Sequence, residues 1–474
     1  MTKHKLPDSP QTQPWLQMLQ WALNPLKFLE NSARDYGDIF TLNIGFNGRP
    51  QVIISNPQGI QEIFTADINK LDSGNPKILE RDSGERYNRA FIGGQSVVTF
   101  DGDRHKQRRK LLMPPFHGER MRAYGEVIND ITQQVTSKWK INEPFSVRSS
   151  TQGISFQVIL KAVFGLEDGE RYDKINQLLT KRLEGGNSIL RILLIVFPIL
   201  QKNLGPLSPW GRLKENQKKI DELIYAEIDE RKANLDPSRT DILSLMMTAR
   251  DENGEAMKDI ELRDELMTLL FAGHETTATS LAWAFYWIHY LPEVREKLLN
   301  ELDSLGENPD PNVIYQLPYL DAVCKETLRI YPPAILAFPR RVLSPIEIMG
   351  YQFEPGTMIS PCIYLTHHRE DIYPEPKQFK PERFLESQFS SSEYLPFGGG
   401  NRICLGMAFA KFEMKLVLAT ILSNWELALA DQQPVKPVRR GILISPSNGV
   451  KMIVNGKRNP VKLGQDERFL TPTS

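Results

Sequence analysis

Residues 397–406 read FGGGNRICLG, and this stretch decides which class of fold the chain adopts. Glycine allows the backbone to approach a flat ligand closely and to adopt positive φ. Cys404 stands at the start of a predicted helix over residues 407–423, two positions after Arg402, and both features favour its thiolate form. A thiolate surrounded by glycines and free amides suits a soft metal, in particular an iron porphyrin. The alternative is a free buried cysteine at a glycine-rich turn.

Length and composition favour one large folded unit. The 474 residues contain no Gly/Ser linker, low-complexity tract or internal repeat, and a chain of this length buries roughly three quarters of its unfolded surface. Lys+Arg and Asp+Glu both number 58, so net charge gives no indication of a nucleic-acid partner, and we expect none. The three cysteines are too few for a disulfide framework, which fits a reducing, cytoplasmic setting.

We expect no stable membrane anchor. Residues 1–27 are polar and broken by four prolines, and the longest apolar tract, residues 189–200, is interrupted by Arg191 and Pro198. Neither approaches the ~20 apolar residues of a transmembrane helix. A soluble protein is therefore predicted, and the apolar tract by itself reads as a core helix.

Helical periodicity dominates the rest of the chain. Residues 121–233 are mainly helical, and residues 259–299 form the longest helical stretch. The prediction is therefore a mainly α protein with small β-sheets. Short β-rich runs are expected at residues 40–44, 51–54, 346–348, 358–359, 441–446 and 450–454, the first two and the last two of them forming hairpins.

One turn of the longest helical stretch combines an acid with an alcohol. Residues 271–278 read FAGHETTA, and Gly273 within a helix costs ~1 kcal/mol relative to alanine. A threonine hydroxyl at this point can bond the i−4 carbonyl and bend the helix. Glu275 and Thr276, set between apolar turns, therefore mark a candidate functional site. A buried helix with a tolerated polar patch is the alternative.

These motifs resemble those of the cytochrome P450 family. Phe-x-x-Gly-x-Arg-x-Cys-x-Gly matches its haem-ligand loop, and Ala-Gly-x-(Asp/Glu)-Thr-Thr matches its oxygen-activation turn. Glu-x-x-Arg at 326–329 and Pro-Glu-Arg-Phe at 381–384 complete four motifs in the right order. The resemblance implies a single-domain fold over residues 30–456, with an α-rich half and a smaller β-containing part. Residues 1–29 would be an N-terminal extension and 457–474 a C-terminal tail.

The resemblance also implies roles for single residues. Cys404 would be the axial ligand of the iron in haem b. Ala272 and Gly273 would leave room for dioxygen, Thr276 would hydrogen-bond the bound oxygen, and Glu275 would relay protons. The residues expected to contact the haem group are Phe397, Gly398, Arg402, Cys404 and Gly406, together with His105, Arg109 and Arg341.

The propionate contacts depend on a basic helix. Residues 101–114 carry six basic groups counting His105, and without the resemblance they would be a solvated basic face. The family has Trp-x-x-x-Arg here, whereas this chain has His105-x-x-x-Arg109. Arg109 carries over as a propionate partner, and His105 would donate through a ring nitrogen. Arg341, with Arg340 as the alternative, and Arg402 are the other propionate candidates.

Three charged residues are assigned to structure by the resemblance. As an exposed i,i+3 pair, Glu326 and Arg329 would contribute well under ~1 kcal/mol. In the family they are buried with a second arginine, Arg383 here, and support the haem loop; such a cluster must be fully bonded. The family's structural His-Arg-Asp is read here as residues 368–370, so His367 and His368 are rejected as metal ligands.

The substrate and the partners are inferred from the same resemblance. The pocket would be lined by Ala334, Ile335, Leu336 and Ile444 and capped by residues 189–200, which are mostly apolar. A fatty acid, alkane or terpenoid is therefore favoured, and a steroid comes second. No flavin or iron–sulfur segment is recognisable, so ferredoxin and ferredoxin reductase, or a flavodoxin, would supply the electrons. The protein is expected to be a monomer. Basic residues near the cysteine loop would dock an acidic ferredoxin: Lys106, Arg108, Lys110, Lys411 and Lys415.

The sequence thus predicts a haem-thiolate monooxygenase, an oxidoreductase that uses dioxygen to hydroxylate or epoxidise an apolar small molecule. One alternative is a haem-thiolate hydroperoxide isomerase or peroxygenase. Such enzymes often lack the acid–alcohol pair that is present here. The other alternative is a non-catalytic haem-binding sensor or carrier, in which an intact proton relay has no purpose.

Overall fold

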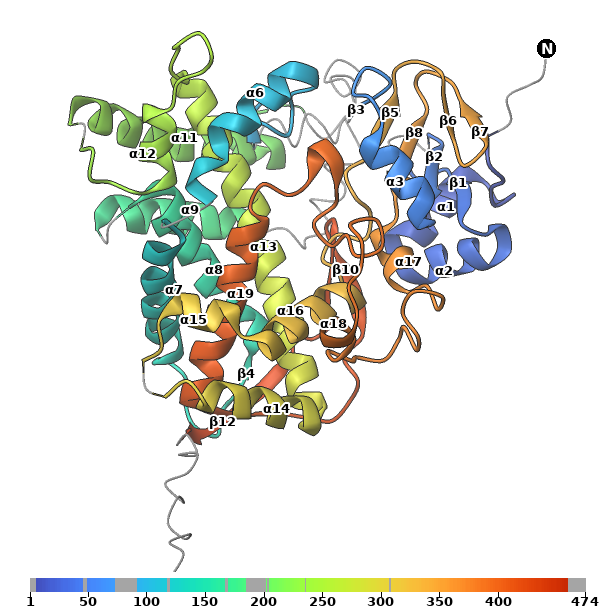
Figure 1. The fold of residues 1–474 in the computed structure, drawn as a ribbon. Coiled ribbons are helices and arrows are strands. Elements are labelled where there is room, and N and C mark those ends of the chain that lie inside the picture. The colour runs from blue at the N-terminus through green and yellow to red at the C-terminus, as the bar shows by residue number, and fades with distance from the viewer. Residues whose placement is uncertain are drawn as a thin grey trace, which may run out of the picture.

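The long helix α13 (Asp259–Tyr290) passes through the middle of the protein, and the other elements are arranged around it (Figure 1). The computed structural model describes residues 6–45, 49–72, 92–116, 120–166, 169–184, 202, 204–234, 236–306 and 308–458. Helices α7 (Arg120–Thr136), α8 (Val147–Phe164) and α19 (Met407–Asn424) pack with α13 in the main hydrophobic core. The mainly α fold with small sheets is confirmed.

Proline sets the start of many helices. Seven helices of the described part of the chain have proline at the first position, where the missing N–H costs nothing and the fixed φ suits a helix. The predicted helix over 259–299 is therefore two helices, because Pro292 begins a new one after Leu291. The other helices are α1 (Pro14–Leu23), α2 (Pro25–Tyr36), α3 (Pro57–Thr65), α6 (Gly102–Leu112), α9 (Glu170–Glu184), α11 (Pro209–Ala233), α12 (Ile242–Thr248), α14 (Pro292–Asp303), α15 (Pro311–Gln316), α16 (Pro318–Ile330), α17 (Ile363–His367) and α18 (Arg383–Glu386), with 3₁₀ turns at Pro114–Phe116, Gly205–Leu207 and Gly400–Arg402.

A five-stranded sheet lies on the other side of α13 from α7, α8 and α11 (Figure 1). Its order is β1-β2-β8-β5-β3, and the predicted hairpin of β1 and β2 is confirmed. β8 pairs parallel with β2 and antiparallel with β5. This pairing places the N-terminal strands beside strands from residues 340–361. The strands are β1 (Ile39–Leu42), β2 (Gln51–Ile54), β3 (Leu71–Asp72), β5 (Arg340–Val342) and β8 (Met358–Pro361).

The predicted hairpin of residues 441–446 with 450–454 is wrong. β11 (Leu443–Pro446) pairs instead with β10 (Pro437–Arg440) across a tight turn at Gly441, whose φ of +63° favours glycine. β12 (Lys451–Lys457) pairs with β4 (Pro144–Ser146) and β9 (Trp425–Leu429). β6 (Ile346–Ile348) and β7 (Tyr351–Phe353) form a separate hairpin.

The hydrophobic core has one large and two small parts. The large one joins the helices around α13, and the small ones lie under the five-stranded sheet and between that sheet and α2. Within the described part of the chain, every helix is too short or too polar to cross a membrane. The predicted lid at 189–200 lies outside the described residues, as do residues 73–91.

Candidate active site

The glycine-rich loop before α19 holds Cys404 in a fixed position. Gly398 and Gly400 have φ values of +67° and +62°, which side chains with a Cβ rarely adopt. A Cβ on Gly399 would lie 2.2 Å from the ring of Phe64, so a third glycine is needed for close packing. The N–H of Cys404 donates to the carbonyl of Phe397 at 2.9 Å. The loop therefore folds back on itself and presents the cysteine at its end.

Cys404 is accessible at the end of this loop. Its side chain is exposed, and yet the atoms crowded around it make burial the main influence on the thiol and raise its pKa. The backbone N–H of Gly406 and the positive charge of Arg109 oppose the effect of burial and lower the pKa. Both groups favour the thiolate form, which is the form that binds a metal.

The accessible turn of α13 supplies other apolar surface. Phe271 is 43% exposed and Ala272 is also exposed, although Leu270 and Ala278 are fully buried. Phe338 is 45% exposed and lies 6.0 Å from the guanidinium of Arg402 in the cysteine loop. These exposed groups within otherwise buried elements fit a flat apolar ligand, as a porphyrin is.

Helix packing explains why glycine stands at position 273, which the sequence did not indicate. A Cβ at this position would lie 2.7 Å from Cδ1 of Ile159, so glycine lets α8 approach α13 closely. The exposed small residue of this turn is Ala272. His274 is buried and its ring packs edge-on against Phe156 at 5.6 Å, as expected for a structural residue.

Glu275 and Thr276 point to different partners. Arg148 donates to Oε2 of Glu275 at 2.6 Å, and Gln152 donates to Oε1 at 2.7 Å. Both partners lie on α8, and sequence reasoning missed them because no local motif joins residues 127 and 123 positions apart. The Thr276 hydroxyl donates to the carbonyl of Ala272 at 2.7 Å, which is the predicted i−4 bond.

Four basic side chains come together beside the cysteine loop. His105 and Arg109 lie one turn apart on α6, and burial, Arg402 and Arg109 lower the pKa of His105 to about 4. Arg340 is buried and donates to the carbonyl of Gly399 at 3.1 Å; burial and Arg402 lower its pKa to about 10. Three arginines and a histidine crowded together, with Asp72 and Asp101 as the neighbouring acids, suit a ligand that carries carboxylates, such as the haem propionates.

Arg402 is already bonded within the protein. It donates to the carboxyl groups of Asp101 at 2.9 Å and Asp72 at 3.3 Å, and to the carbonyl of Phe100 at 2.6 Å. Arg109 donates to the carbonyl of Ile403 at 2.6 Å. These bonds hold α6 and the preceding segment against the cysteine loop.

The choice of Arg341 over Arg340 as a propionate partner stays a prediction. The two residues are neighbours in β5, so their side chains leave opposite faces of the sheet. Arg340 reaches the basic cluster, whereas Nε of Arg341 is buried without a hydrogen-bond partner among the described residues. The face that each side chain takes depends on the pairing of β5 with β8, which the sequence did not reveal.

The predicted support cluster is confirmed as buried and bonded. Glu326 accepts two bonds from Arg329, at 2.7 and 2.8 Å, and one from Arg383 at 3.2 Å. The N–H of Lys380 donates to Glu326 as well, at 2.8 Å. Arg329 also donates to the carbonyls of His367, Pro376 and Gln378. Arg383 also donates through Nη1 to the carbonyl of Pro374, and only its Nη2 lacks a partner among the described residues, so the buried charges are almost fully bonded.

His367 connects this cluster to the cysteine loop. The N–H of Leu395 donates to its Nε2 at 2.9 Å, so Nδ1 carries the proton and donates to the carbonyl of Arg329 at 3.2 Å. Burial lowers the pKa of His367 well below its usual value. These two backbone bonds account for His367 without a metal.

The expected substrate-facing residues divide into two groups. Ala334 and Leu336 are half-buried and alternate with buried residues, as in an extended segment. Ile335 and Ile444 are buried in the core beside Leu29 and Phe40. The assignment of Ile335 and Ile444 to the pocket stays a prediction.

Most of the expected basic docking patch is neutralised. Arg108 is buried and donates to Glu261 at 2.5 Å, and Lys415 is buried against Asp321 at 2.7 Å. Lys110 pairs with Glu252 at 3.2 Å. Lys106 remains exposed, and Lys411 lies 5.6 Å from the ring of Phe397.

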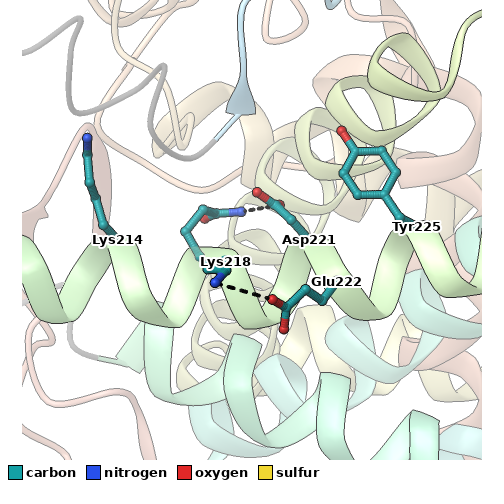
Figure 2. Close-up of a pocket in the computed structure, with 6 residues that line it drawn as sticks. Lys214, Lys218, Asp221, Glu222 and Tyr225 are labelled. Atoms are coloured by element: carbon teal, nitrogen blue, oxygen red, sulfur yellow. Dashed lines mark hydrogen bonds and ion pairs between the residues drawn. The ribbon is translucent and has the colours of Figure 1, made fainter.

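A surface hollow on α11 is separate from these residues. Figure 2 shows its lining side chains along one face of the helix, with Lys218 paired to Glu222 at 3.8 Å. Its volume is about 380 Å³. The lining residues are Lys214, Gln217, Lys218, Asp221, Glu222 and Tyr225, and none of them belongs to the predicted site.

Fold and site together define a class: a mainly helical protein with an accessible cysteine on a glycine-rich loop beside a basic cluster. These residues fit a haem group, which Cys404 would hold through its sulfur. The family model described as Cytochrome P450 matches residues 7–454. The chain belongs to the cytochrome P450 family, and it is an oxidoreductase of the monooxygenase type with haem b as cofactor.

Several relatives match over nearly the whole chain. Cytochrome P450 135B1 of Mycobacterium tuberculosis is 33% identical, covering 96% of this chain and 92% of the relative. Cytochrome P450 138 of the same organism is also 33% identical, covering 95% and 96%. A structure of cyanobacterial CYP120A1 with bound retinoic acid has a TM-score of 0.80 at 24% identity, covering 95% of this chain and 99% of that one. This structural likeness shows the fold.

Proposed function

We propose that the protein hydroxylates or epoxidises an extended apolar small molecule, with a fatty acid, alkane or terpenoid as the favoured class, and that separate redox proteins supply its electrons. The observation that carries the proposal is the acid–alcohol pair on an accessible turn of α13, combined with the accessible Cys404. When bound, haem b supplies the binding and activation of dioxygen, with electron density from the cysteine thiolate.

Cys404 supports this chemistry as a thiolate. The N–H of Gly406 and the charge of Arg109 stabilise negative charge on the sulfur. The basic cluster would hold the carboxylates of the cofactor through His105, Arg109 and Arg340, and Arg402 keeps that cluster in place by its bonds to Asp72 and Asp101. The low pKa of His105 keeps its ring neutral. It would therefore offer a hydrogen bond from one ring N–H and no positive charge.

Glu275 and Thr276 handle protons. The hydroxyl of Thr276 is held by the carbonyl of Ala272, and by rotating it would donate a hydrogen bond into the site where haem b would supply dioxygen chemistry. Arg148 and Gln152 of α8 keep the carboxylate of Glu275 in position. Glu275 would receive protons on the side of the turn that faces α8. A positioned acid and alcohol of this kind typically contribute about 10²- to 10⁴-fold in rate.

The substrate class follows from the apolar surface of the site. Phe271, Ala272, Leu336 and Phe338 present apolar side chains, and burial of apolar area drives binding. The structural relative binds retinoic acid, an isoprenoid acid, which supports an elongated apolar substrate for this chain. The exposed Lys106 and the half-buried Lys411 are the remaining candidates for contact with an acidic ferredoxin.

A spin-state titration tests the proposal. The purified haem protein is titrated with a panel of fatty acids, alkanes, terpenoids and steroids, and turnover of the binders is measured with a ferredoxin and its reductase. A binder from the first three groups that is converted to an oxygenated product supports the proposal. Binding and conversion of steroids alone, or of none of the panel, would contradict it.

A further inference from the structure

Helix α1 turns its apolar side chains outward. Trp15 is 66% exposed, Leu19 46% and Leu23 74%, and Met18 is exposed as well. These positions are three or four residues apart, so they form one continuous face of the helix. The buried residue of α1 is instead the polar Gln17. This arrangement is the reverse of an ordinary surface helix, whose apolar stripe faces the core.

Hydrogen bonds fix α1 in this orientation. The side-chain amide of Gln17 donates to two preceding carbonyls, at 2.9 and 3.0 Å. Its Oε1 accepts from the N–H of Asn43, which follows β1, at 2.8 Å. One turn further along α1, Arg439 of β10 donates to the carbonyl of Trp21 at 2.9 Å. A rotation that buried the apolar face would break these bonds, so the outward orientation is part of the fold.

The hairpin of β10 and β11 lies beside α1. The guanidinium of Arg439 is 5.5 Å from the ring of Trp21. Ile442, in the turn of this hairpin, is 70% exposed and adds a further apolar side chain to the surface of this region. β11 also packs against α13, the helix that carries Glu275 and Thr276. The hairpin therefore contacts both α1 and the helix of the candidate active site.

The charges around the exposed face suit an anionic lipid surface. Residues 9–26 contain no charged side chain. Lys27 is exposed at one end of this stretch, and Arg439 reaches Trp21 from β10. Asp8 stands at the other end. An apolar helix face bordered by basic groups matches a bilayer with anionic headgroups, and exposed tryptophan is typical of the boundary between water and lipid.

The face is small for a protein partner. α1 has ten residues and is therefore about 15 Å long. A face of that length and about 10 Å in width is several-fold smaller than the area of about 800 Å² that each partner buries in a stable protein–protein interface. A bilayer needs no matching surface, because an apolar helix face enters the boundary between headgroups and acyl chains on its own.

We infer that α1 docks on the surface of a lipid bilayer, with Trp15, Met18, Leu19 and Leu23 inserted between the headgroups. Binding is peripheral and reversible, since a ten-residue helix is too short to span the hydrocarbon core. Docking brings the protein to the phase in which apolar small molecules collect, with the hairpin that packs against α13 next to it. This inference concerns where the protein acts and goes beyond the proposed function.

Sedimentation with vesicles tests the docking surface. The haem-loaded protein is mixed with vesicles of equal parts phosphatidylcholine and phosphatidylglycerol, and the bound fraction is measured for wild type and for a Leu19→Glu, Leu23→Glu double variant. The double variant should bind about 10-fold more weakly or less, because two charges replace side chains that enter the lipid. Its melting temperature should match that of wild type, since both leucines are exposed.

Val313→Glu is the matched control. Val313 is 46% exposed, as Leu19 is, and its helix α15 lies on the other side of α13 from α1 (Figure 1). This variant should bind the vesicles as wild type does. Wild type that does not bind them, or a double variant that binds as tightly as wild type, would overturn the inference.

Tryptophan fluorescence reports insertion directly. Adding the same vesicles should shift the emission of wild type to shorter wavelength, because Trp15 leaves water for lipid. Trp15→Phe should lose most of this shift. A shift that remains complete in Trp15→Phe would contradict the insertion of α1.

Light scattering without lipid tests the other occupant of this face. Wild type should stay monomeric as its concentration rises. A dimer that forms in wild type and is lost in the Leu19→Glu, Leu23→Glu variant would assign the face to a second copy of the chain and overturn the inference. None of these measurements depends on turnover, so their failure is distinct from a failure of the proposed function.

Discussion

Arg148 donates through Nη2 to Oε2 of Glu275 at 2.6 Å, and this ion pair joins the first turn of α8 to the middle of α13. The arginine side chain is 11% exposed and that of the glutamate 28%, so solvent screens the pair only in part. Gln152 holds the second carboxyl oxygen. Glu275 can exchange a proton with water only when these bonds loosen, so Arg148 is a positioning residue for the proton path.

A double-mutant cycle on this pair should show strong coupling. We expect Arg148→Gln and Glu275→Gln each to destabilise the fold, because each leaves one half-buried charge unpaired. The double variant should recover part of the loss, with a coupling energy of roughly 1–3 kcal/mol in urea unfolding. The exposed pair of Lys110 and Glu252 is the control and should couple by under about 0.5 kcal/mol. Equal coupling in the two pairs would contradict this account.

Thr276→Ala should uncouple electron consumption from product formation. The variant loses the hydroxyl that donates toward bound oxygen and keeps the apolar surface of the turn. We expect product per electron to fall about 10-fold or more, with hydrogen peroxide released in its place. Ser280→Ala, whose hydroxyl bonds the carbonyl of Thr276 one turn further on, is the control. Full activity of the Thr276→Ala variant would indicate an isomerase and would contradict the monooxygenase mechanism.

Arg340 and Arg341 form a matched pair for testing the basic cluster. Arg340→Ala should weaken haem binding by roughly 10-fold or more, because a charge-assisted hydrogen bond contributes about 1.5–3 kcal/mol. Arg341→Ala should leave haem affinity close to that of wild type. Haem transfer to an acceptor protein measures both. The opposite order of effects would support the assignment to Arg341.

Glu326→Ala should prevent stable haem incorporation. It leaves Arg329 and Arg383 as buried charges without their carboxylate, at a cost of about 3–5 kcal/mol. The bond from Arg329 through His367 to Leu395 transmits the loss to the cysteine loop. Glu170→Ala, in an exposed i,i+4 pair with Lys174, is the control. Full haem content in Glu326→Ala would refute a supporting role.

Local motifs made much of the site predictable. The cysteine loop, the α13 turn and the Glu326–Arg329 pair each depend on residues close in sequence, and the i−4 bond of Thr276 follows from helix geometry alone. The family resemblance then related these motifs to one another and to haem b.

Contacts between distant segments were not predictable. The partners of Glu275 lie on another helix, and the choice between Arg340 and Arg341 depends on strand pairing. The pairing of β11 with β10 was missed because two turns that each contain a glycine, Gly441 and Gly449, flank β11. Single-sequence patterns do not distinguish which turn closes a hairpin.

The central claim is that the thiolate of Cys404 binds the iron of haem b. Adding carbon monoxide to the reduced protein tests this directly, with Cys404→Ser as the comparison. The account predicts a red-shifted Soret band typical of sulfur ligation in wild type and its loss in the variant. A wild-type protein that binds haem without that band, or a variant that retains it, would contradict the account.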